Sequence, residues 1–367
     1  MTTLLPKVAV QYLAYLHPGA EKDIEDCFCS LEQVSYPHDR WHIVVVDNPY
    51  GDDCRAEELF RTRWMPKARR TLPEMTFVRS EKNTGFAGGH VAAHEAIRSW
   101  EPDFLYLLNQ DTVCDPGFLE EAVRVAASDP RIATVQSRVM LKQEPFLLNS
   151  CGNCLHVLGF GFSDGYRRTP EDARRHPRPH FFNSGAGLLV RTGVLEAVGG
   201  LFDPAYFMYH DDVDLAWRAR LAGYRHAYAE ASVIYHRYEF SRSIAKFYLM
   251  ERNRLVTHAS RLRLPTLLLM LLPLLVMEGG TAAFAWKSGW LKEKCRVWAF
   301  FFLPSTWSWI RRLRRQTARI RRVPDREILR YMVGRIEAQE IENPLLKRVV
   351  NPLMVAYFFL LKAVVRW

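Results

Sequence analysis

Short hydrophobic runs alternate with segments of helical apolar spacing through the first two thirds of the chain. The runs are rich in β-branched and aromatic side chains, which is typical of strands. They lie at residues 7–12, 41–47, 75–79, 104–108, 132–140 and 231–235. Helical spacing covers residues 20–31, 90–100, 116–127 and 215–223. This alternation predicts an α/β fold on a mostly parallel sheet.

Polar side chains follow two of these predicted strands directly. Asp47 and Asn48 come after the run at 41–47, and Asp111 closes the stretch after 104–108. Ligands of parallel sheets bind at the carboxyl ends of strands, which makes these positions candidates for a site. Asp and Asn are also common in ordinary turns, so either position alone is explained at least as well by turn chemistry.

A glycine-rich stretch at residues 82–89 separates a predicted strand from a predicted helix. Exposed backbone N–H groups beside a helix N-terminus can receive a diphosphate. The stretch matches neither the dinucleotide fingerprint nor the P-loop, so it predicts phosphate binding only in combination with other features.

Two isolated residues are candidates for a metal site. A hard divalent cation prefers oxygen ligands such as the Asp111 carboxylate, and diphosphate oxygens can complete its shell. His236 follows the predicted strand at 231–235, although a lone histidine is more often structural. Cys151 and Cys154 form a C-x-x-C pair without the further ligands of a zinc site. We interpret the seven cysteines as reduced thiols of a reducing compartment.

Two adjacent carboxylates begin the predicted helix that ends at Gly223. Asp211 and Asp212 are explained either as favourable charges at a helix N-terminus or as a general base. Close carboxylates raise one another's pKa, while the helix dipole opposes this shift. The aromatic stretch at 206–209 would then form a wall of a cleft.

The C-terminal third carries three apolar runs flanked by Trp, Lys and Arg. They lie at residues 264–277, 297–310 and 349–361. Each is shorter than the ~20 residues that span a bilayer, and the flanks are typical of helices in the membrane interface. Two alternatives stay open: core helices of a second soluble domain, or one span over 264–286 with Glu278 inside it at a cost.

The net charge of +10 is unevenly distributed. From residue 241 onward there are 24 Lys and Arg against 8 Asp and Glu, whereas residues 1–240 have 26 against 32. We therefore predict a catalytic domain over 1–245 and a helical, basic, membrane-associating region over 246–367. A basic region can bind lipid phosphate or nucleic acid. The N-terminus lacks the pattern of a signal peptide.

The order of these motifs resembles the family 2 inverting glycosyltransferases of the GT-A fold, which have a Rossmann-like catalytic domain. It is most similar to the bacterial rhamnosyl- and galactofuranosyl-transferase-like branch. The resemblance covers residues 7–240. The matching motifs are Val10-Gln11-Tyr12, Val46-Asp47-Asn48, residues 83–89, residues 107–112, Asn183-Ser184-Gly185-Ala186, residues 199–203, residues 211–215, Arg220 with Gly223-Tyr224, and His236.

The resemblance implies a role for each matching residue. Nucleotide-sugar binding is implied for Gln11, Tyr12, Asp47, Asn48, Asn83, Gly85, Gly89, Asn109, Gln110, Ser184, Gly185 and Ala186. Asp111 and His236 would hold Mg²⁺ or Mn²⁺, and Asp212, or else Asp211, would be the catalytic base. Two positions depart from the family pattern, because Asn109 replaces a carboxylate of the D-x-D motif and Asp211 replaces a glutamate.

The resemblance also implies the reaction. A nucleotide-diphosphate sugar would donate to a saccharide hydroxyl with inversion, and the acceptor would be a lipid-linked glycan of the cell envelope. The expected location is the cytoplasmic face of the membrane, bound to anionic lipid, and self-association through the tail stays open. The alternatives are a polyprenyl-phosphate glycosyltransferase, or a nucleic-acid binder that uses the arginines of residues 311–322.

Overall fold

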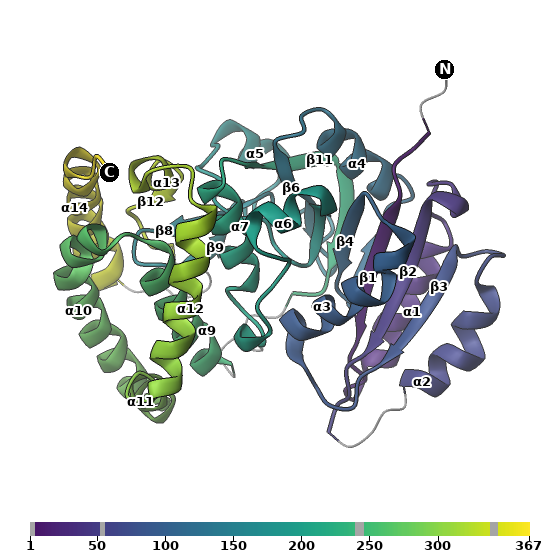
Figure 1. Cartoon of the computed structure of the whole chain (residues 1–367), viewed down its shortest axis with the longest axis horizontal. Coiled ribbons are helices and arrows are strands. Elements are labelled where there is room, and N and C mark those ends of the chain that lie inside the picture. The colour runs from purple at the N-terminus through teal and green to yellow at the C-terminus, as the bar shows by residue number, and fades with distance from the viewer. Residues whose placement is uncertain (1–3, 52–55, 239–245, 338–343) are drawn as a thin grey trace.

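The computed structural model describes residues 4–51, 56–238, 246–337 and 344–367. Its centre is a nine-stranded sheet (Figure 1). The strand order is β3 (Glu74–Arg79), β2 (Trp41–Asp47), β1 (Val8–Ala14), β4 (Phe104–Leu108), β10 (Gly187–Arg191), β6 (Ile132–Leu141), β11 (Arg225–His236) and β5 (Thr112–Cys114), with β7 (Leu148–Ser150) paired to β6. The α/β class predicted from the sequence is therefore confirmed.

The sheet is mixed, which corrects the expectation of a mostly parallel one. Strands β3, β2, β1 and β4 run parallel, but β10 is antiparallel to both of its neighbours. Gly187 at the start of β10 pairs with Leu108 at the end of β4. Reversing β10 thus brings the segment before it to the same sheet edge as the residues that follow β4.

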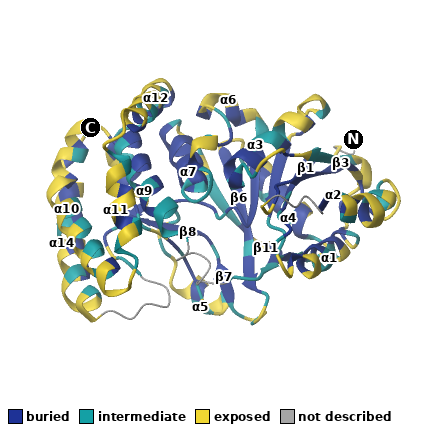
Figure 2. Cartoon of the chain, turned by 90° about the horizontal axis from the view of Figure 1, so that it is seen from below, coloured by how far each residue is buried: buried dark blue, intermediate teal, exposed yellow. Residues whose placement is uncertain are grey.

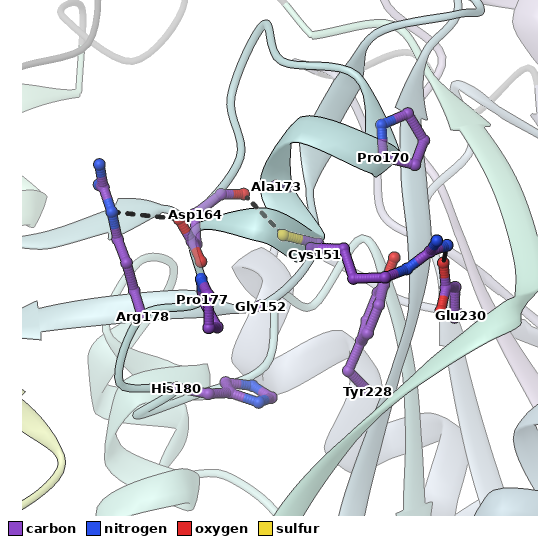
Figure 3. A pocket seen from close by; sticks show the side chains of 11 residues that line it. Cys151, Gly152, Asp164, Pro170, Ala173, Pro177, Arg178, His180, Tyr228 and Glu230 are labelled. Atoms are coloured by element: carbon purple, nitrogen blue, oxygen red, sulfur yellow. Dashed lines mark hydrogen bonds and ion pairs between the residues drawn. The ribbon is translucent and has the colours of Figure 1, made fainter.

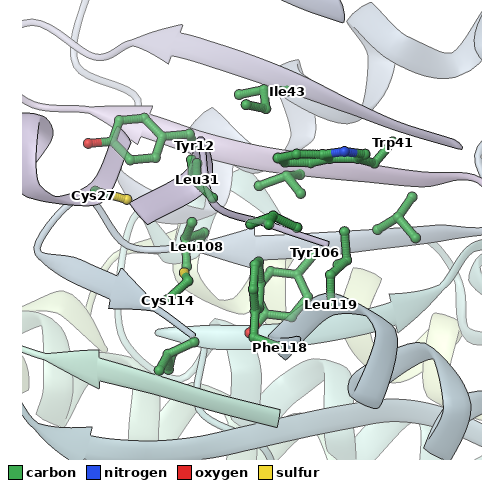
Figure 4. Close-up of a cluster of buried hydrophobic side chains, with 14 of the residues drawn as sticks. Tyr12, Cys27, Leu31, Trp41, Ile43, Tyr106, Leu108, Cys114, Phe118 and Leu119 are labelled. Carbon is green, nitrogen blue, oxygen red and sulfur yellow. The ribbon is translucent and has the colours of Figure 1, made fainter. Parts of the chain in front are cut away.

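Helices cover both faces of the sheet. Helices α1 (Ala20–Leu31) and α4 (Phe118–Ala127) pack on one face over a dense apolar core. Figure 4 shows Tyr12, Ile43 and Tyr106 from the strands against Leu31 and Phe118 from these helices. The opposite face is covered by α3 (Gly85–Ile97), α6 (Leu195–Val198) and α7 (Asp211–Leu221).

Helix α3 begins five residues before the predicted start, so the glycine-rich stretch is only partly a loop. Residues 85–89 form its first turns. Asn83 Oδ1 accepts the N–H of Gly85 at 2.8 Å, and Asn48 Oδ1 accepts the N–H of Thr84 at 2.8 Å. These side-chain acceptors satisfy N–H groups that a helix start leaves unbonded, which stabilises the helix through a glycine-rich sequence of low propensity.

A small second sheet joins the tail to the catalytic region. It consists of β8 (Asn153–His156) between β9 (Gly161–Ser163) and β12 (Met332–Val333). Because β12 comes from the C-terminal region and pairs with β8, strand pairing connects the two parts of the chain.

Six α-helices lie in the described part of the C-terminal region. They are α9 (Phe247–Arg261), α10 (Leu264–Lys287), α11 (Leu291–Phe300), α12 (Pro304–Ile320), α13 (Asp325–Leu329) and α14 (Asn351–Val364). Val256 of α9 and Leu313 of α12 belong to the same buried cluster as Leu215 and Ala219 of α7. Packing is therefore continuous across residue 245, and the division predicted there stays a prediction.

Helices α10 and α14 lie side by side at the end of the molecule farthest from β3 (Figure 1). With 24 residues, α10 is longer than its apolar run suggested, since the helix continues through Glu278 and two glycines. Among the described residues, it is the one helix that is long and apolar enough to cross a membrane, on length and composition alone. Its outer side and that of α14 are largely exposed (Figure 2).

Candidate active site

A cavity of about 380 Å³ opens where β4 ends, β10 begins and α7 begins. Seven residues that the sequence singled out line it: Asn109, Ser184, Gly185, Ala186, Asp211, Asp212 and His236. They come from four separate stretches of the chain, and the mixed strand order brings these stretches together. Much of the remaining wall comes from residues 160–163, residues 208–210 and helix α9.

His236 lines the cavity, and Asp111, the other candidate metal ligand, lies beside it. His236 Nε2 lies 3.3 Å from Asp111 Oδ1 and 3.3 Å from Asn109 Nδ2. Its other ring nitrogen, Nδ1, is 3.0 Å from Asn149 Oδ1. An amide oxygen can only accept, so this contact assigns the ring proton to Nδ1 and turns the Nε2 lone pair toward Asp111. Asn149 has no local sequence signal and was missed.

A divalent cation fits this pair only with help from a ligand. A carboxylate and an imidazole nitrogen suit Mn²⁺, and the carboxylate suits Mg²⁺. In the part of the chain that the structure describes, no group of three His, Cys, Asp or Glu side chains gathers around a common point. Diphosphate and water oxygens would therefore supply most of the coordination shell.

The side chains of Gln11 and Tyr12 do not line the cavity. Both residues are completely buried. Gln11 Oε1 lies 3.0 Å from Nδ1 of His90 beneath α3, while the Tyr12 ring packs edge-on against Phe28 on the other face. Neither side chain can contact a nucleotide in this conformation, because strand alternation directs both into the two cores rather than to the sheet edge.

The other predicted donor-site residues organise the edge of the sheet. Asn48 Nδ2 donates to the carbonyl of Gly85 at 3.0 Å, in addition to its bond with Thr84. Gln110 holds the backbone of Tyr15 on both sides, accepting its N–H at 2.8 Å and donating to its carbonyl at 3.0 Å. Asp47 is buried at the end of β2. These contacts tie together the ends of β1, β2 and β4.

Neighbouring groups approach the backbone so closely at positions 85 and 185 that only glycine fits there. Gly85 has φ of +70°, and a Cβ there would lie 2.2 Å from the carbonyl oxygen of Phe207. A Cβ on Gly185 would lie 2.6 Å from the ring of Phe86. Gly89 packs against Leu13 in the same way within α3. Glycine therefore lets α3, the segment before β10 and the loop before α7 meet at one point.

The two adjacent carboxylates, Asp211 and Asp212, line the cavity at the start of α7. Asp211 is buried and accepts the N–H of Asp212 at 3.0 Å. Asp212 is half-buried and accepts N–H bonds from Val213 at 2.8 Å and Gly185 at 3.4 Å. Burial raises the pKa of Asp212 to about 6. Burial and the neighbouring Asp212 raise the pKa of Asp211 well above its ordinary value.

The residues before Asp211 have a strained backbone. Phe207, Tyr209 and His210 all have φ between 62° and 66°, in the left-handed region that side chains disfavour. Such residues cost about 1–3 kcal/mol each and cluster at functional sites. The sequence carried no signal of this strain, because none of the three is Gly, Asn or Asp.

A buried ionic cluster forms the wall of the cavity nearest the tail. Arg254 pairs with Glu251 at 2.8 Å and also with Glu278 of α10, and Lys294 of α11 lies 2.6 Å from Glu251 and 2.8 Å from Glu278. Burial alone would raise the pKa of Glu251, but Arg254 and Lys294 lower it to about 2. The two negative charges of the cluster thus balance its two positive charges. The side chain of Glu278 faces the protein body.

A second cavity of about 290 Å³ lies beside the C-x-x-C pair. The thiol of Cys151 donates to the Asp164 carbonyl at 3.5 Å, and burial raises its pKa to about 12. Figure 3 shows Arg178 directed at Asp164, and Arg174 pairs with Glu230. The thiol is therefore not activated, and these arginines are already neutralised.

The arginine-rich segment at 311–322 contributes to the packing of the tail. Arg312 pairs with Asp203 at 2.8 Å, Arg314 donates to the carbonyl of Ala259 at 2.6 Å, and Arg321 pairs with Asp325 at 2.6 Å. Three of its arginines thus hold α12 in place, which weakens the alternative of a free nucleic-acid-binding stripe.

Comparison with known proteins agrees with this geometry. The family model described as "Glycosyltransferase like family 2" matches residues 21–257, which include the carboxylates of α7, the Asp111–His236 pair and most of α9. The chain belongs to this family. The glycosyltransferase class inferred from the order of motifs is therefore confirmed.

The glycosyltransferase has curated relatives that differ in their acceptors. It is 31% identical over 252 residues to the N-acetylglucosaminyl-diphospho-decaprenol L-rhamnosyltransferase of Mycobacterium tuberculosis, covering 64% of this chain and 76% of that protein. It is 26% identical over 233 residues to glucomannan 4-beta-mannosyltransferase 7 of Arabidopsis thaliana, covering 61% and 38%.

Solved structures with the same fold include metal-bound enzymes. A mannosyltransferase from Pyrobaculum calidifontis, in complex with GDP-Man and Mn²⁺, gives a TM-score of 0.50 at 18% identity, covering 87% of this chain and 86% of that one. GalNAc-T7 with UDP, GalNAc and Mn²⁺ gives 0.52 at 12% identity, covering 70% and 48%. These similarities support the GT-A fold of the glycosyltransferase.

Proposed function

We propose that this glycosyltransferase transfers a sugar, with inversion, from a nucleotide-diphosphate donor to a hydroxyl of a lipid-linked glycan. The observation that carries the proposal is one cavity lined by both Asp212 and His236, with Asp111 lying 3.3 Å from His236. The relative from Mycobacterium tuberculosis, whose name gives an N-acetylglucosaminyl-diphospho-decaprenol acceptor, supports the choice of acceptor.

The donor occupies the end of the cavity near the sheet edge. Asn48 and Asn83 shape the start of α3, and Ser184 to Ala186 line the sugar position. Asp111 and His236 would hold Mg²⁺ or Mn²⁺, which supplies positive charge to neutralise the leaving diphosphate. Asn149 keeps His236 in the tautomer that this role requires.

Asp212 takes the proton of the acceptor hydroxyl. Its pKa of about 6 suits a base that must be ionised near neutral pH yet still accept a proton. The freed oxygen attacks the anomeric carbon from the side opposite the diphosphate, and a single displacement inverts that carbon. Asp211 is more deeply buried than Asp212, so we assign the base to Asp212.

The acceptor occupies the opposite end of the cavity. Its wall there carries Phe160, Phe162, Met208 and Met250. The flat rings of the two phenylalanines can pack against a sugar ring, and Glu251 and Arg254 of the ionic cluster line the same cavity. The acceptor thus approaches from the side of the tail helices.

We infer that the exposed face of α10 and α14 binds an anionic membrane surface. Leu268, Leu272 and Val276 on α10 and Phe359 and Leu360 on α14 are each at least 62% exposed. The region that carries them has a large excess of Lys and Arg, which favours anionic headgroups over a second copy of the same basic surface. A lipid-linked acceptor would be presented at such a surface.

Contacts of α10 with the body favour a helix that lies in the membrane plane over one that crosses. Near its start, Thr266 Oγ1 donates to Asp325 at 2.7 Å; twelve residues later, Glu278 pairs with Arg254 and Lys294. Both points are attached to the same folded body, and the carboxylate of Glu278 would not be left in hydrocarbon. We therefore propose a monotopic attachment.

The decisive experiment is a donor and acceptor screen of the purified full chain with Mg²⁺ or Mn²⁺. A panel of nucleotide-sugars is incubated in parallel with N-acetylglucosaminyl-diphospho-lipid and with polyprenyl phosphate, and the product linkage is determined by NMR. We expect one donor to give a product of inverted anomeric configuration. Retention of configuration would refute the mechanism, and transfer only to polyprenyl phosphate would refute the acceptor.

A further inference from the structure

The loop that leads into the carboxylate pair follows a short 3-10 turn, η6 (Pro204–Tyr206). Phe207, Tyr209 and His210 have left-handed backbone, and His210 occupies the cap position directly before Asp211. Three such residues within four positions do not hold their conformation by local preference. Something outside the loop must therefore maintain it.

Asn253 of α9 contacts the inner side of this loop. Its Nδ2 lies 2.9 Å from the carbonyl oxygens of Tyr206 and Met208 and 2.8 Å from that of Tyr209. The side chain is completely buried, and neighbouring Arg252 adds a bond of 3.0 Å to the carbonyl of Ala205. One amide group thus faces three carbonyls that the left-handed turns direct inward.

Helix α3 contacts the same loop from another side. The carbonyl of Phe207 accepts the N–H of Ala87 at 3.1 Å, and Gly85 leaves room for that approach. The loop is therefore held between α3, which shapes the donor site, and α9, which begins after the predicted domain boundary. The position of Asp212 relative to Gly185 depends on both helices.

We propose that Asn253 is a positioning residue for the catalytic base. It keeps the loop at 206–210 in its left-handed conformation and so sets the start of α7 against the donor site. A base displaced by about 1 Å loses on the order of 100-fold in rate, because proton transfer needs hydrogen-bonding distance. The proposal rests on the assignment of Asp212 as the base.

The test compares Asn253→Ala, Asn253→Ser and Asn253→Asp in the full chain. Turnover is measured as nucleoside diphosphate released from the most active donor of the panel, and affinity is measured by calorimetry with UDP, GDP and dTDP in the presence of Mn²⁺. We expect kcat to fall at least 30-fold in Asn253→Ala and Asn253→Asp, with nucleoside diphosphate affinity within threefold. Asn253→Ser keeps one donor and should retain more activity.

Asn351 provides a matched control. It is also buried in the tail and bridges both backbone groups of Ile336 at 2.9 Å, away from the cavity. Asn351→Ala should keep kcat within threefold at equal folded fraction. A kcat near wild type in Asn253→Ala, or parallel losses of kcat and nucleotide affinity in both Asn253 and Asn351 variants, would overturn the proposal.

The pH dependence separates positioning from general damage. If Asn253 sets the surroundings of Asp212, the acid limb of the kcat profile should shift in Asn253→Ser, while the profile of Asn351→Ala should coincide with wild type. An unchanged limb with reduced kcat would count against the proposal. Full activity of Asp212→Asn would instead remove the base assignment, so the two failures are distinguishable.

Discussion

His236 Nε2 lies 3.3 Å from Asp111 Oδ1 because the end of β11 pairs antiparallel with β5, which begins directly after Asp111. The pairing register places His236 opposite Thr112. Asn149 holds the far side of the imidazole at 3.0 Å. A carboxylate and an oriented imidazole thus lie side by side, and the imidazole lines the cavity.

This pair predicts a turnover that depends on a divalent metal. EDTA should abolish activity, and Mn²⁺ or Mg²⁺ should restore it. His236→Ala should raise the metal concentration for half-maximal rate by about 10- to 100-fold, and Asn149→Ala should raise it within the same range through the lost orienting bond. Metal titrations of turnover give both values. His176→Ala is the control, since that side chain is 69% exposed outside the cavity.

Loss of the proposed base should affect chemistry far more than donor binding. Asp212→Asn preserves shape but cannot accept the proton, so we expect turnover to fall by about 100- to 10,000-fold. Nucleoside diphosphate affinity should stay within a few fold. Steady-state kinetics measure the turnover, and calorimetry measures the nucleoside diphosphate affinity. Asp172→Asn, at an exposed carboxylate on α5 (Pro170–Arg175), should change neither, and an active Asp212→Asn would exclude this base.

The raised pKa of Asp212 predicts an acid limb in the rate profile. The base works only when ionised, so kcat should fall as the pH drops through about 6. Asp212→Asn should remove this limb from any residual activity. A profile of the wild type that is flat between pH 5 and 8 would contradict the assignment.

The raised pKa of Asp212 also predicts that the protein becomes less stable as the pH rises, whereas its rate increases. The folded state holds this proton more tightly than the unfolded chain, so the contribution to stability is complete below about pH 4 and is lost as the pH rises through about 6. Asp212→Asn should therefore stabilise the protein at pH 8 by about 1–3 kcal/mol and have little effect at pH 4. Thermal unfolding at the two pH values measures the difference.

A substitution at Glu278 tests whether α10 is held to the body by ion pairs or crosses a membrane. Removing the Glu278 carboxylate from the ionic cluster leaves the two positive charges of Lys294 and Arg254 with a single acidic partner. Glu278→Leu should therefore destabilise the fold by about 3–5 kcal/mol. Glu293→Leu removes an exposed pair with Arg296 and should cost at most about 1 kcal/mol. Denaturant unfolding compares them. A stabilised Glu278→Leu protein that becomes inseparable from membranes would favour a span.

The apolar face predicts binding to anionic vesicles. Leu272 is 72% exposed on α10, and Leu272→Glu should reduce flotation with phosphatidylglycerol-containing vesicles by at least tenfold without changing nucleotide affinity. Phe146→Glu, at a 65% exposed residue outside the tail helices, is the control. If Leu272→Glu instead converts a dimer to a monomer in solution, the face binds a second copy.

Local sequence was sufficient for several of the elements and for the class of enzyme. Helix α1 and strands β2 and β4 occupy the predicted residues, because each pattern depends on neighbours along the chain. The order of motifs was sufficient for the glycosyltransferase family. It also placed the carboxylate pair at a helix start, where the structure has it.

Only the tertiary structure decided which side chains share the site. Strand alternation buried Gln11 and Tyr12, and the antiparallel β10 set Ser184–Ala186 beside Asn109. Asn253 and the inward direction of Glu278 depend on helices distant in sequence. Hydrophobic spacing reports what one segment can bury, whereas these positions depend on what the rest of the chain packs against it.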